Sequence, residues 1–312
     1  MSGVQTRALR LKLPATSANL GPGFDAAGLA MSMHLAVEAH VAPTFQIHAT
    51  GRAPELCGAL ENNLILETYR DVLTRAGREA APLRLSLHNE IPLGAGCGSS
   101  AAALLAGVAL ADHFGGLKLS DEAIVAEATR REGHPDNIAA CWYGGFTVSA
   151  QVDEPGALAG VTPRVEHATF GADSGWQMLV VIQPTPLSTS KARALLPDRY
   201  TRADAVFNVQ RSALLTAAFA ADDLKLLRTA TQDRMHQPYR EQACPLLGAL
   251  LPLAAEAEIA AVTLSGAGPS VLVFLAEGTT ILEAETRIRS MVAGEVEILP
   301  VTIAGGVERT IL

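Results

Sequence analysis

The feature that most constrains this chain is a glycine-rich segment that runs directly into a long apolar stretch. In PLGAGCGSSAA, residues 92–102, three glycines occupy every second position. Glycine lets the backbone turn tightly and approach a ligand without obstruction by a Cβ atom. The apolar run that follows suits a buried helix, whose free first-turn amides and dipole favour an anion. The segment therefore indicates a phosphate-binding loop, with an ordinary tight turn as the alternative. Ser99 and Ser100 are expected to cap the helix.

Two common phosphate loops fit this segment poorly. A Walker loop requires a lysine directly after glycine, and no lysine of this chain follows one. The dinucleotide fingerprint is matched only loosely, although Asp121 and Glu122 lie near the position, about 20 residues on, where that fingerprint places an acidic residue. Because no convincing crossover strand flanks the segment, a nicotinamide enzyme is disfavoured.

Composition excludes several other classes of protein. The 312 residues are 49% hydrophobic, enough for two domains with a large core. The net charge is -8 and no basic cluster is present, which argues against a nucleic-acid partner. No stretch approaches the roughly 20 apolar residues of a membrane span, and the N-terminus lacks an apolar signal core. We expect a cytoplasmic protein without a membrane partner, whose four separated cysteines are reduced.

Hydrophobic periodicity divides the chain into two halves. In the first half it predicts strands and helices over residues 9–13, 62–76, 83–87, 101–114, 120–131 and 146–152. Residues 153–164 hold two prolines and two glycines without apolar periodicity, and they predict a boundary between domains 1–165 and 166–312. The second half reads strand, helices, strand–turn–strand, helix, strand, over residues 176–184, 204–235, 243–257, 260–276, 279–293 and 295–303. This β-α-β-β-α-β order fits a ferredoxin-like layer.

Three segments together resemble one protein family. The glycine segment looks like the ATP-binding motif of the GHMP kinases, Pro-x3-Gly-Leu-Gly-Ser-Ser-Ala, with Cys97 in place of the usual leucine. PATSANLGPGFD, residues 14–25, is similar to the first motif of the homoserine kinases within that family, and SGAGPS, residues 265–270, resembles the third GHMP motif. All three stand in the family's order, so the resemblance covers nearly the whole chain.

The resemblance implies an α+β, two-domain GHMP kinase fold, with an N-terminal ribosomal-protein-S5-like ATP-binding domain and a C-terminal ferredoxin-like domain. It also implies ATP and Mg²⁺ as cofactors, L-homoserine as substrate, O-phospho-L-homoserine as product, and a homodimer. Two alternatives stay open. One is another GHMP kinase, acting on mevalonate or an isoprenoid monophosphate, and the other is a family member without catalytic activity.

The same resemblance suggests roles for individual residues. EGHPDNIAA, TSKARALLP and DRMHQPYR, at residues 132–140, 189–197 and 233–240, all resemble homoserine kinase segments. The expected nucleotide-binding residues are Pro92, Leu93, Gly94, Ala95, Gly96, Cys97, Gly98, Ser99, Ser100, Ala101 and Ala102. The expected substrate-binding residues are Asn19, Asp25, His134, Asn137, Thr189, Arg193 and Arg240. Arg193 and Arg240 are expected to hold the substrate carboxylate, because a guanidinium group is a rigid two-pronged donor.

The metal and the chemistry are expected to depend on a few oxygen-bearing side chains. Ser99 or Ser100 and a carboxylate should hold Mg²⁺, which prefers oxygen ligands, and both Glu127 and Glu132 are candidates. Asp136, Asn137 and Arg193 are the expected catalytic residues, with Asp136 the one obvious general base. Cys97, close to a helix N-terminus, is expected to have a lowered pKa and to be protected from alkylation by ATP.

Overall fold

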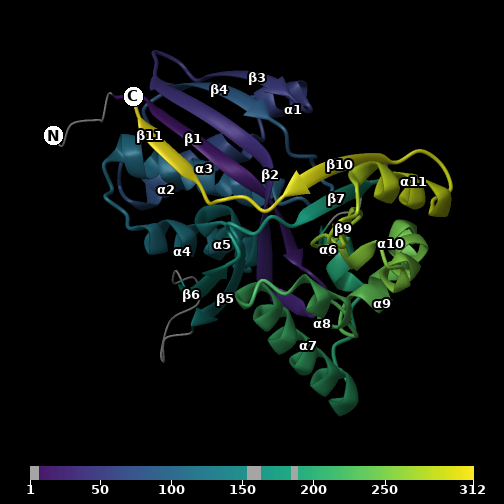
Figure 1. Cartoon of the computed structure of the whole chain (residues 1–312). Coiled ribbons are helices and arrows are strands. Elements are labelled where there is room, and N and C mark those ends of the chain that lie inside the picture. Colours follow the sequence, from purple (N-terminus) through teal and green to yellow (C-terminus); the bar gives the residue numbers. More distant parts are fainter. Residues whose placement is uncertain (1–6, 153–162, 184–188) are drawn as a thin grey trace.

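The computed structural model describes residues 7–152, 163–183 and 189–312. Two β-sheets organise the chain, a larger one mainly from the N-terminal half and a smaller one from the C-terminal half, and helices pack against both (Figure 1). The larger sheet has the order β11-β1-β2-β4-β3, and β5 and β6 extend it from β2. Its strands are β1 (Leu9–Asn19), β2 (Gly23–Val41), β3 (Gln46–Gly51), β4 (Leu83–Asn89), β5 (Phe146–Val152), β6 (Arg164–Phe170) and β11 (Glu308–Ile311).

The long strand β2 was not expected from the sequence. Buried and exposed residues alternate strictly in β4, which made that strand easy to predict. Residues 27–31 of β2 are all buried, so this part of the strand shows no alternation of buried and exposed positions. The pairing of β1 with β2 also shifts register between Pro14 and Ala15 and again between Ala18 and Asn19. Such bulges bend a strand and re-aim its side chains.

Helices of the N-terminal half cover one face of the larger sheet. They are α1 (Pro54–Gly58), α2 (Leu64–Arg75), α3 (Ser99–Gly115), α4 (Asp121–Glu132) and α5 (Asp136–Tyr143). The side chains of Asn63 and Ser120 cap α2 and α4, and Gly133 ends α4 in a left-handed conformation. The most deeply embedded helix is α3, which is buried around most of its circumference.

The C-terminal half confirms the ferredoxin-like prediction. Its strands β7 (Gln177–Ile182), β8 (Ile259–Leu264), β9 (Val271–Leu275) and β10 (Glu297–Thr302) are all antiparallel, in the order β10-β7-β9-β8. The helices of this half are α6 (Thr189–Ala194), α7 (Arg202–Ala220), α8 (Leu227–Ala230), α9 (Gln237–Arg240), α10 (Pro245–Leu250) and α11 (Ile281–Met291), with 3₁₀ segments at Leu224–Leu226, Glu241–Ala243 and Leu251–Ala255.

Alternate residues of the small sheet face two different cores. Met178 and Val180 pack into the core that also fills the N-terminal half. Leu179 and Val181 face a second core beneath α10 and α11. The larger sheet also extends beyond residue 165, because β6 pairs with β5 and β11 pairs with β1. The two halves therefore share a core, and the last strand of the chain belongs to the first sheet.

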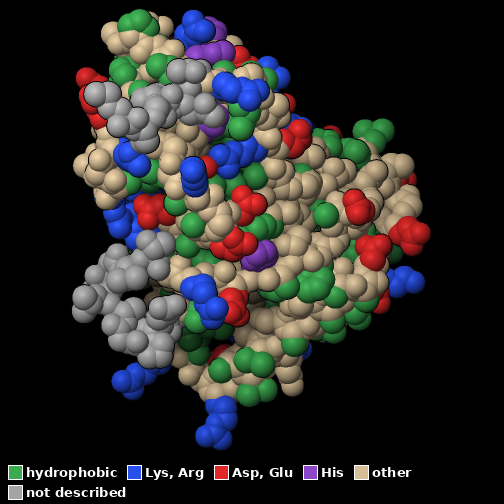
Figure 2. All heavy atoms as spheres, turned by 90° about the vertical axis from the view of Figure 1, so that its left-hand side faces the viewer, with side chains coloured by type: hydrophobic (Ala, Val, Ile, Leu, Met, Phe, Trp, Pro, Cys, Tyr) green, Lys and Arg blue, Asp and Glu red, His purple; other side chains and the backbone are tan. Residues whose placement is uncertain are grey.

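The surface carries charges of both signs. On the face turned toward the viewer in Figure 2, Lys and Arg side chains are interspersed with Asp and Glu side chains. Within the described residues, no helix has the length and apolar character needed to cross a bilayer.

Candidate active site

The turn between β1 and β2 holds the first set of polar side chains. Asn19, Leu20 and Asp25 all have positive φ angles, of 71°, 46° and 55°. Asn19 supports the turn twice, because its Nδ2 donates to the carbonyl of Gly266 at 2.9 Å and its Oδ1 accepts from the Asp25 amide at 3.0 Å. The backbone is thus held in an unfavourable region that directs the Asp25 side chain toward the cleft.

The glycine loop lies between β1 and the turn at residues 265–270. Gly94, Gly96 and Gly98 have φ angles of 66°, 76° and 70°, and a Cβ on Gly96 would lie 2.3 Å from the Ser265 carbonyl oxygen. The Ser265 hydroxyl donates to the Gly96 carbonyl at 2.8 Å. Two of the three family motifs therefore interlock at this point, and only glycine leaves the space.

The same loop opens onto the N-terminus of α3. The N-cap is Gly98, so the expectation that Ser99 or Ser100 caps the helix is wrong, and no side chain caps it. The first-turn amides are consequently free of a side-chain acceptor, and Gly98, Ser99 and Ser100 line the cleft. This is the arrangement in which a helix N-terminus binds a phosphate group.

The segment after α4 brings three polar side chains against the loop. His134 Nδ1 donates to Asp136 Oδ1 at 2.6 Å, and the Asn137 amide donates to the same oxygen at 2.6 Å. Asn137 Oδ1 accepts from the Thr16 hydroxyl at 2.7 Å, which ties this segment to β1. Burial alone would lower the pKa of His134, but the hydrogen bond to Asp136 and the nearby carboxylates outweigh it and raise that pKa.

Two arginines enter the cleft from the C-terminal half. Arg193, on α6, donates from both terminal nitrogens to the two carboxylate oxygens of Asp25, each at 2.8 Å. Arg240 is only 2% exposed, and it donates to the carbonyls of Ala192 and Gly266. No carboxylate within the described residues forms an ion pair with Arg240. A buried guanidinium without a counter-charge suits an anionic ligand.

The structure separates the two candidate metal ligands. The Ser100 hydroxyl donates to Glu132 Oε2 at 2.9 Å at the mouth of the glycine loop. Glu132 has no ion-pair partner among the described residues, so its charge is available. Because hard oxygen donors from a serine and a glutamate are what Mg²⁺ prefers, these residues fit the ion. Ser99 lies beside them on the cleft wall.

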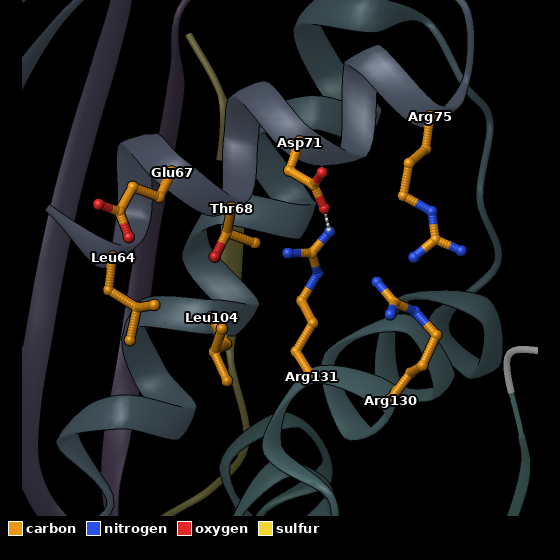
Figure 3. A pocket seen from close by; sticks show the side chains of 8 residues that line it. All are labelled: Leu64, Glu67, Thr68, Asp71, Arg75, Leu104, Arg130 and Arg131. Atoms are coloured by element: carbon orange, nitrogen blue, oxygen red, sulfur yellow. Dashed lines mark hydrogen bonds and ion pairs between the residues drawn. The ribbon is translucent and has the colours of Figure 1, made fainter. Parts of the chain in front are cut away.

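Glu127 lies elsewhere, and the structure does not bring it to the cleft. It accepts from Arg130 and Arg131 at 2.9–3.0 Å, and Arg75 lies 3.8 Å away. Burial alone would raise the pKa of Glu127, but Arg130 and Arg131 outweigh it and lower that pKa. The arginines line a separate hollow between α2, α3 and α4, where Arg131 also pairs with Asp71 (Figure 3). Glu127 thus ties α4 to α2.

The predicted lowering of the Cys97 pKa is wrong. Its thiol is only 1% exposed, and burial raises its pKa to about 12 despite the nearby helix N-terminus. Desolvation of a thiolate outweighs the helix dipole when the sulfur is fully enclosed. The side chains of Pro92, Ala95, Ala101 and Ala102 are likewise buried, so these residues shape the loop by packing. Thr189 begins α6, but its side chain lies outside the described part of the structure.

The remaining expected residues share one cleft of about 190 Å³. Every backbone segment described above contributes to its wall. Its lining includes Asn19, Asp25, Gly94, Gly96, Gly98, Ser99, Ser100, Glu132, His134, Asp136, Asn137, Arg193, Arg240 and Gly266. Residues as far apart in the chain as Asn19 and Gly266, which are 247 positions apart, therefore meet at one site.

The sequence did not reveal an apolar hollow at the outer end of the glycine loop. Leu93 and Ser99 line it, together with Leu56, Asn62 and Leu64 from the segment around α1 and α2. Leu56 is 70% exposed and Leu93 is 41% exposed, which is unusual for large apolar side chains placed together. Because Ser99 lines both spaces, the hollow and the cleft are adjacent. The turn at residues 62–64, directly before α2, was the one sequence feature that could have pointed to this hollow.

The arrangement can hold a ligand with three parts. The apolar hollow suits a flat aromatic group, the uncapped N-terminus of α3 suits phosphates, and the two arginines suit a small carboxylate at the far end. The carboxylates of Asp25 and Asp136 and a ring nitrogen of His134 lie within 4.8 Å of one another. Asp25 is already paired with Arg193 and Asp136 with His134, so Glu132 is the better metal ligand.

Comparisons with known proteins agree with this geometry. The model for the GHMP kinases N terminal domain matches residues 63–145, and the model for GHMP kinases C terminal matches residues 215–293. A homoserine kinase of Solibacter usitatus is 46% identical over 270 residues, which cover 86% of this chain and 85% of the relative. A homoserine kinase of Thermus thermophilus is 43% identical over 264 residues, covering 84% and 85%.

Solved structures share the fold. A structure from Listeria monocytogenes is 28% identical, with a TM-score of 0.76 over 97% of this chain and 99% of that one. The crystal structure of homoserine kinase from Cytophaga hutchinsonii has a TM-score of 0.75 at 22% identity, over 99% of each chain. A mevalonate kinase also aligns, with a TM-score of 0.64 at 12% identity, over 95% of this chain and 99% of that one, so the fold alone does not select the substrate. The chain belongs to the GHMP kinase family, a family of ATP-dependent kinases.

Proposed function

We propose that this protein is a homoserine kinase, which transfers the γ-phosphoryl group of ATP to the hydroxyl of L-homoserine and releases O-phospho-L-homoserine. The observation that carries the proposal is the placement of Arg193 and Arg240 beside Asp25, at the end of the cleft next to the glycine loop. An α-amino acid needs cations for its carboxylate and an anion for its ammonium group. The homoserine kinases that are 46% and 43% identical support the same substrate.

In this proposal the nucleotide lies along the glycine loop. The backbone amides of residues 94–100 bind the phosphates, and the adenine ring occupies the apolar hollow between Leu93 and Leu64. Gly96 and Gly98 keep the loop pressed against β1 and the turn at residues 265–270. The terminal phosphate would then lie nearest Ser100 and Glu132.

Homoserine would bind at the inner end of the cleft. Its carboxylate contacts Arg193 and Arg240, and its ammonium group contacts Asp25. Holding both charged ends leaves the side-chain hydroxyl directed toward the glycine loop. Since transfer depends mainly on in-line positioning and charge neutralisation, this orientation is the principal contribution of the chain to catalysis.

Glu132 and Ser100 would hold Mg²⁺. When bound there, the ion neutralises charge on the phosphates. The fit rests on the 2.9 Å hydrogen bond that already brings the two oxygens together, and on the lack of another cation at Glu132 among the described residues. His134, whose pKa is raised by Asp136 and the nearby carboxylates, adds positive charge to the same cleft when protonated.

Asp136 would act as an organiser more than as a base. It is 1% exposed, and one of its oxygens accepts from His134 and from the Asn137 amide. Asp136→Asn is therefore expected to retain at least about a tenth of the wild-type kcat at saturating substrates, whereas loss of a general base costs about 10²–10⁴-fold. Steady-state kinetics with homoserine varied at saturating ATP distinguish these results.

The proposed function is tested by ADP release from the purified protein with ATP, Mg²⁺ and one acceptor at a time. Homoserine should be used with a kcat/KM at least about a hundredfold above those of serine, mevalonate and galactose, because only homoserine combines both charges with a hydroxyl at this distance. Equal or better use of mevalonate would favour the alternative GHMP kinase. ATP binding without turnover of any acceptor would favour a non-catalytic role.

A cytoplasmic location and a homodimer are part of the same proposal. Light scattering of the purified protein would give the oligomeric state directly. A mass of one chain, against 32.6 kDa calculated from the sequence, would reject the dimer.

A further inference from the structure

The two side chains assigned to opposite ends of the amino acid are bonded to each other. Arg193 and Asp25 form a two-pronged ion pair, with both nitrogen–oxygen distances at 2.8 Å. The pair is not a buried ion pair, because 44% of the Arg193 side chain and 33% of the Asp25 side chain remain exposed. It therefore faces the cleft, where a ligand can reach it.

Arg240 lies next to this pair but is bonded differently. Its Nε and Nη1 donate to the carbonyls of Ala192 and Gly266 and to a nitrogen of His236. The guanidinium carbons of Arg193 and Arg240 lie 5.3 and 5.5 Å from the centre of the Phe24 ring. The cleft thus holds two neighbouring arginines and only one aspartate that pairs with either of them, among the residues that the structure describes.

We propose that the Asp25–Arg193 ion pair is an internal substitute for the charges of the substrate, and that a zwitterion enters by exchanging both partners at once. The incoming carboxylate takes Arg193 together with Arg240, and the incoming ammonium group takes Asp25. Arg193 thus exchanges the carboxylate of Asp25 for that of the substrate. Asp25 exchanges the guanidinium of Arg193 for the ammonium group of the substrate. This inference rests on the proposed function, because that function assigns the two ends of the amino acid.

The exchange makes the pair a specificity device against ligands with a single charge. A carboxylate without an ammonium group would have to separate Arg193 from Asp25 and leave Asp25 unpaired near Asp136. An amine without a carboxylate would leave Arg193 unpaired beside Arg240. Because a third or more of each side chain remains exposed, solvent screens the unpaired charge in part, and we expect each analogue to lose roughly three- to tenfold in affinity on this account. Specificity then comes partly from the protein charge that a ligand with a single charge leaves unpaired.

The test compares homoserine with two analogues that each lack one charge. 4-Hydroxybutanoate keeps the carboxylate and hydroxyl, and 3-aminopropan-1-ol keeps the ammonium group and hydroxyl. Dissociation constants are measured by titration calorimetry on the full chain with a non-hydrolysable ATP analogue, and a thermal melt checks the folding of each variant. In wild type, both analogues should bind more weakly than homoserine.

Asp25→Asn gives the decisive result, because the two acids should respond in opposite directions. Homoserine loses its ammonium partner and should bind at least about tenfold more weakly. 4-Hydroxybutanoate no longer competes with Asp25 for Arg193 and should bind about three- to tenfold more tightly. Arg193→Gln tests the other partner of the pair. Homoserine should bind this variant more weakly than wild type, and 3-aminopropan-1-ol should bind it more tightly.

Glu132→Gln is the matched control, since it removes a carboxylate of the same cleft that is not paired with an arginine. If a general loss of negative charge explained the tightening, this variant would show the same gain for 4-hydroxybutanoate. The exchange is overturned if Asp25→Asn leaves 4-hydroxybutanoate binding unchanged or weaker while wild type still phosphorylates homoserine. If Asp25→Asn does not fold, Arg193→Gln decides by the same criterion. A wild-type protein that neither binds nor phosphorylates homoserine would overturn the proposed function as well.

Discussion

Two glutamates on α4 show how neighbouring residues of one type come to have unrelated roles. Glu127 is surrounded by Arg75, Arg130 and Arg131, which satisfy its carboxylate. Glu132, five positions later, turns the other way and meets Ser100. Spacing along α4 places Arg130 and Arg131 three and four positions from Glu127, but it could not show that Glu132 meets Ser100, because that contact comes from the start of α3.

Exchange of each glutamate for glutamine should therefore give opposite phenotypes. Glu132→Gln is expected to lower kcat by about a hundredfold or more and to raise the Mg²⁺ concentration needed, because a metal ligand is lost. Glu127→Gln should leave the Mg²⁺ requirement unchanged and lower the free energy of unfolding by about 1–3 kcal/mol, because charged hydrogen bonds are lost. Mg²⁺ titrations of activity and urea denaturation measure the two quantities. A changed Mg²⁺ requirement in Glu127→Gln would contradict this assignment.

His236 packs behind the substrate site and contacts Arg240. It is fully buried, its Nε2 donates to the Gly21 carbonyl at 2.7 Å, and its Nδ1 faces Arg240 Nη1 at 3.2 Å. With Nε2 as the donor, Nδ1 accepts from Arg240, so the ring is neutral. Burial lowers the pKa of His236, with Asp233 opposing that change and Arg240 reinforcing it. The histidine is a positioning residue for Arg240.

This environment predicts a loss of stability in acid. Below the ordinary histidine pKa of 6.5 the unfolded chain takes up a proton that the folded chain refuses, so the free energy of unfolding falls with pH from there down to the lowered pKa. The loss from one histidine is at most about 1.4 kcal/mol per pH unit. His236→Gln should lack this component in urea titrations between pH 8 and 5. His48→Gln, at an exposed position of β3, tests whether loss of any histidine side chain has the same effect.

At the level of elements, the glycine loop is held more by its neighbours than by its own hydrogen bonds. Gly96 fits beneath the carbonyls of Ser265 and Gly268, whereas a Cβ on Gly94 would meet nothing within 4 Å. Both residues have positive φ angles, so both would be strained by a side chain. Only Gly96 would also be overpacked.

A pair of alanine variants separates these two effects. Gly94→Ala should lower the free energy of unfolding by about 1–2 kcal/mol, the cost of a left-handed non-glycine residue. Gly96→Ala should lose a further 1–3 kcal/mol or so through overpacking. Urea denaturation of both variants gives the difference. If both variants lost the same free energy of unfolding, the turn at residues 265–270 would have to shift at no cost to make room for a Cβ at position 96.

The elements that could be predicted from sequence were those with a distinct local pattern. β4 alternates buried and exposed residues, the strands of the small sheet are short apolar runs between turn residues, and the glycine loop has its own motif. β2 was missed because its first half, rich in Gly and Ala, shows neither pattern, and α5 was missed because it is short and begins directly after Pro135. The apolar hollow at Leu56 and Leu93 was also missed, since its walls come from separate segments that no local pattern connects.

At the level of the whole molecule, the last strand completes the first sheet. β11 pairs with β1 from Leu9–Ile311 to Lys12–Glu308, and Arg309 bonds Asp112 at 2.7 Å. A boundary drawn by sequence position cannot anticipate this, because short terminal strands have no pattern of their own. Leu9 and Leu11 on β1 are fully buried partly through that cover.

Removal of β11 should therefore weaken the whole protein. A chain that ends at Val307 loses a four-residue strand, and at about 0.5–1.5 kcal/mol per hydrogen bond its free energy of unfolding should fall by several kcal/mol. Glu308→Gln, which removes only the exposed pair with Lys12, should cost no more than about 1 kcal/mol. Urea denaturation compares the two. An unchanged midpoint for the shortened chain would show that β11 contributes little.

The return of the chain to its first strand also determines the order in which the protein can form during its synthesis. Domains generally fold from the N-terminus as they emerge from the ribosome. Here β1 is made before its outer neighbour, β11, which is the last strand among the described residues. The nascent chain therefore carries an unpaired strand edge until residues 308–311 have been made, and such edges invite pairing with other chains. The glycine loop bonds the same strand at Thr16, so we expect its support to be complete only once β11 is in place.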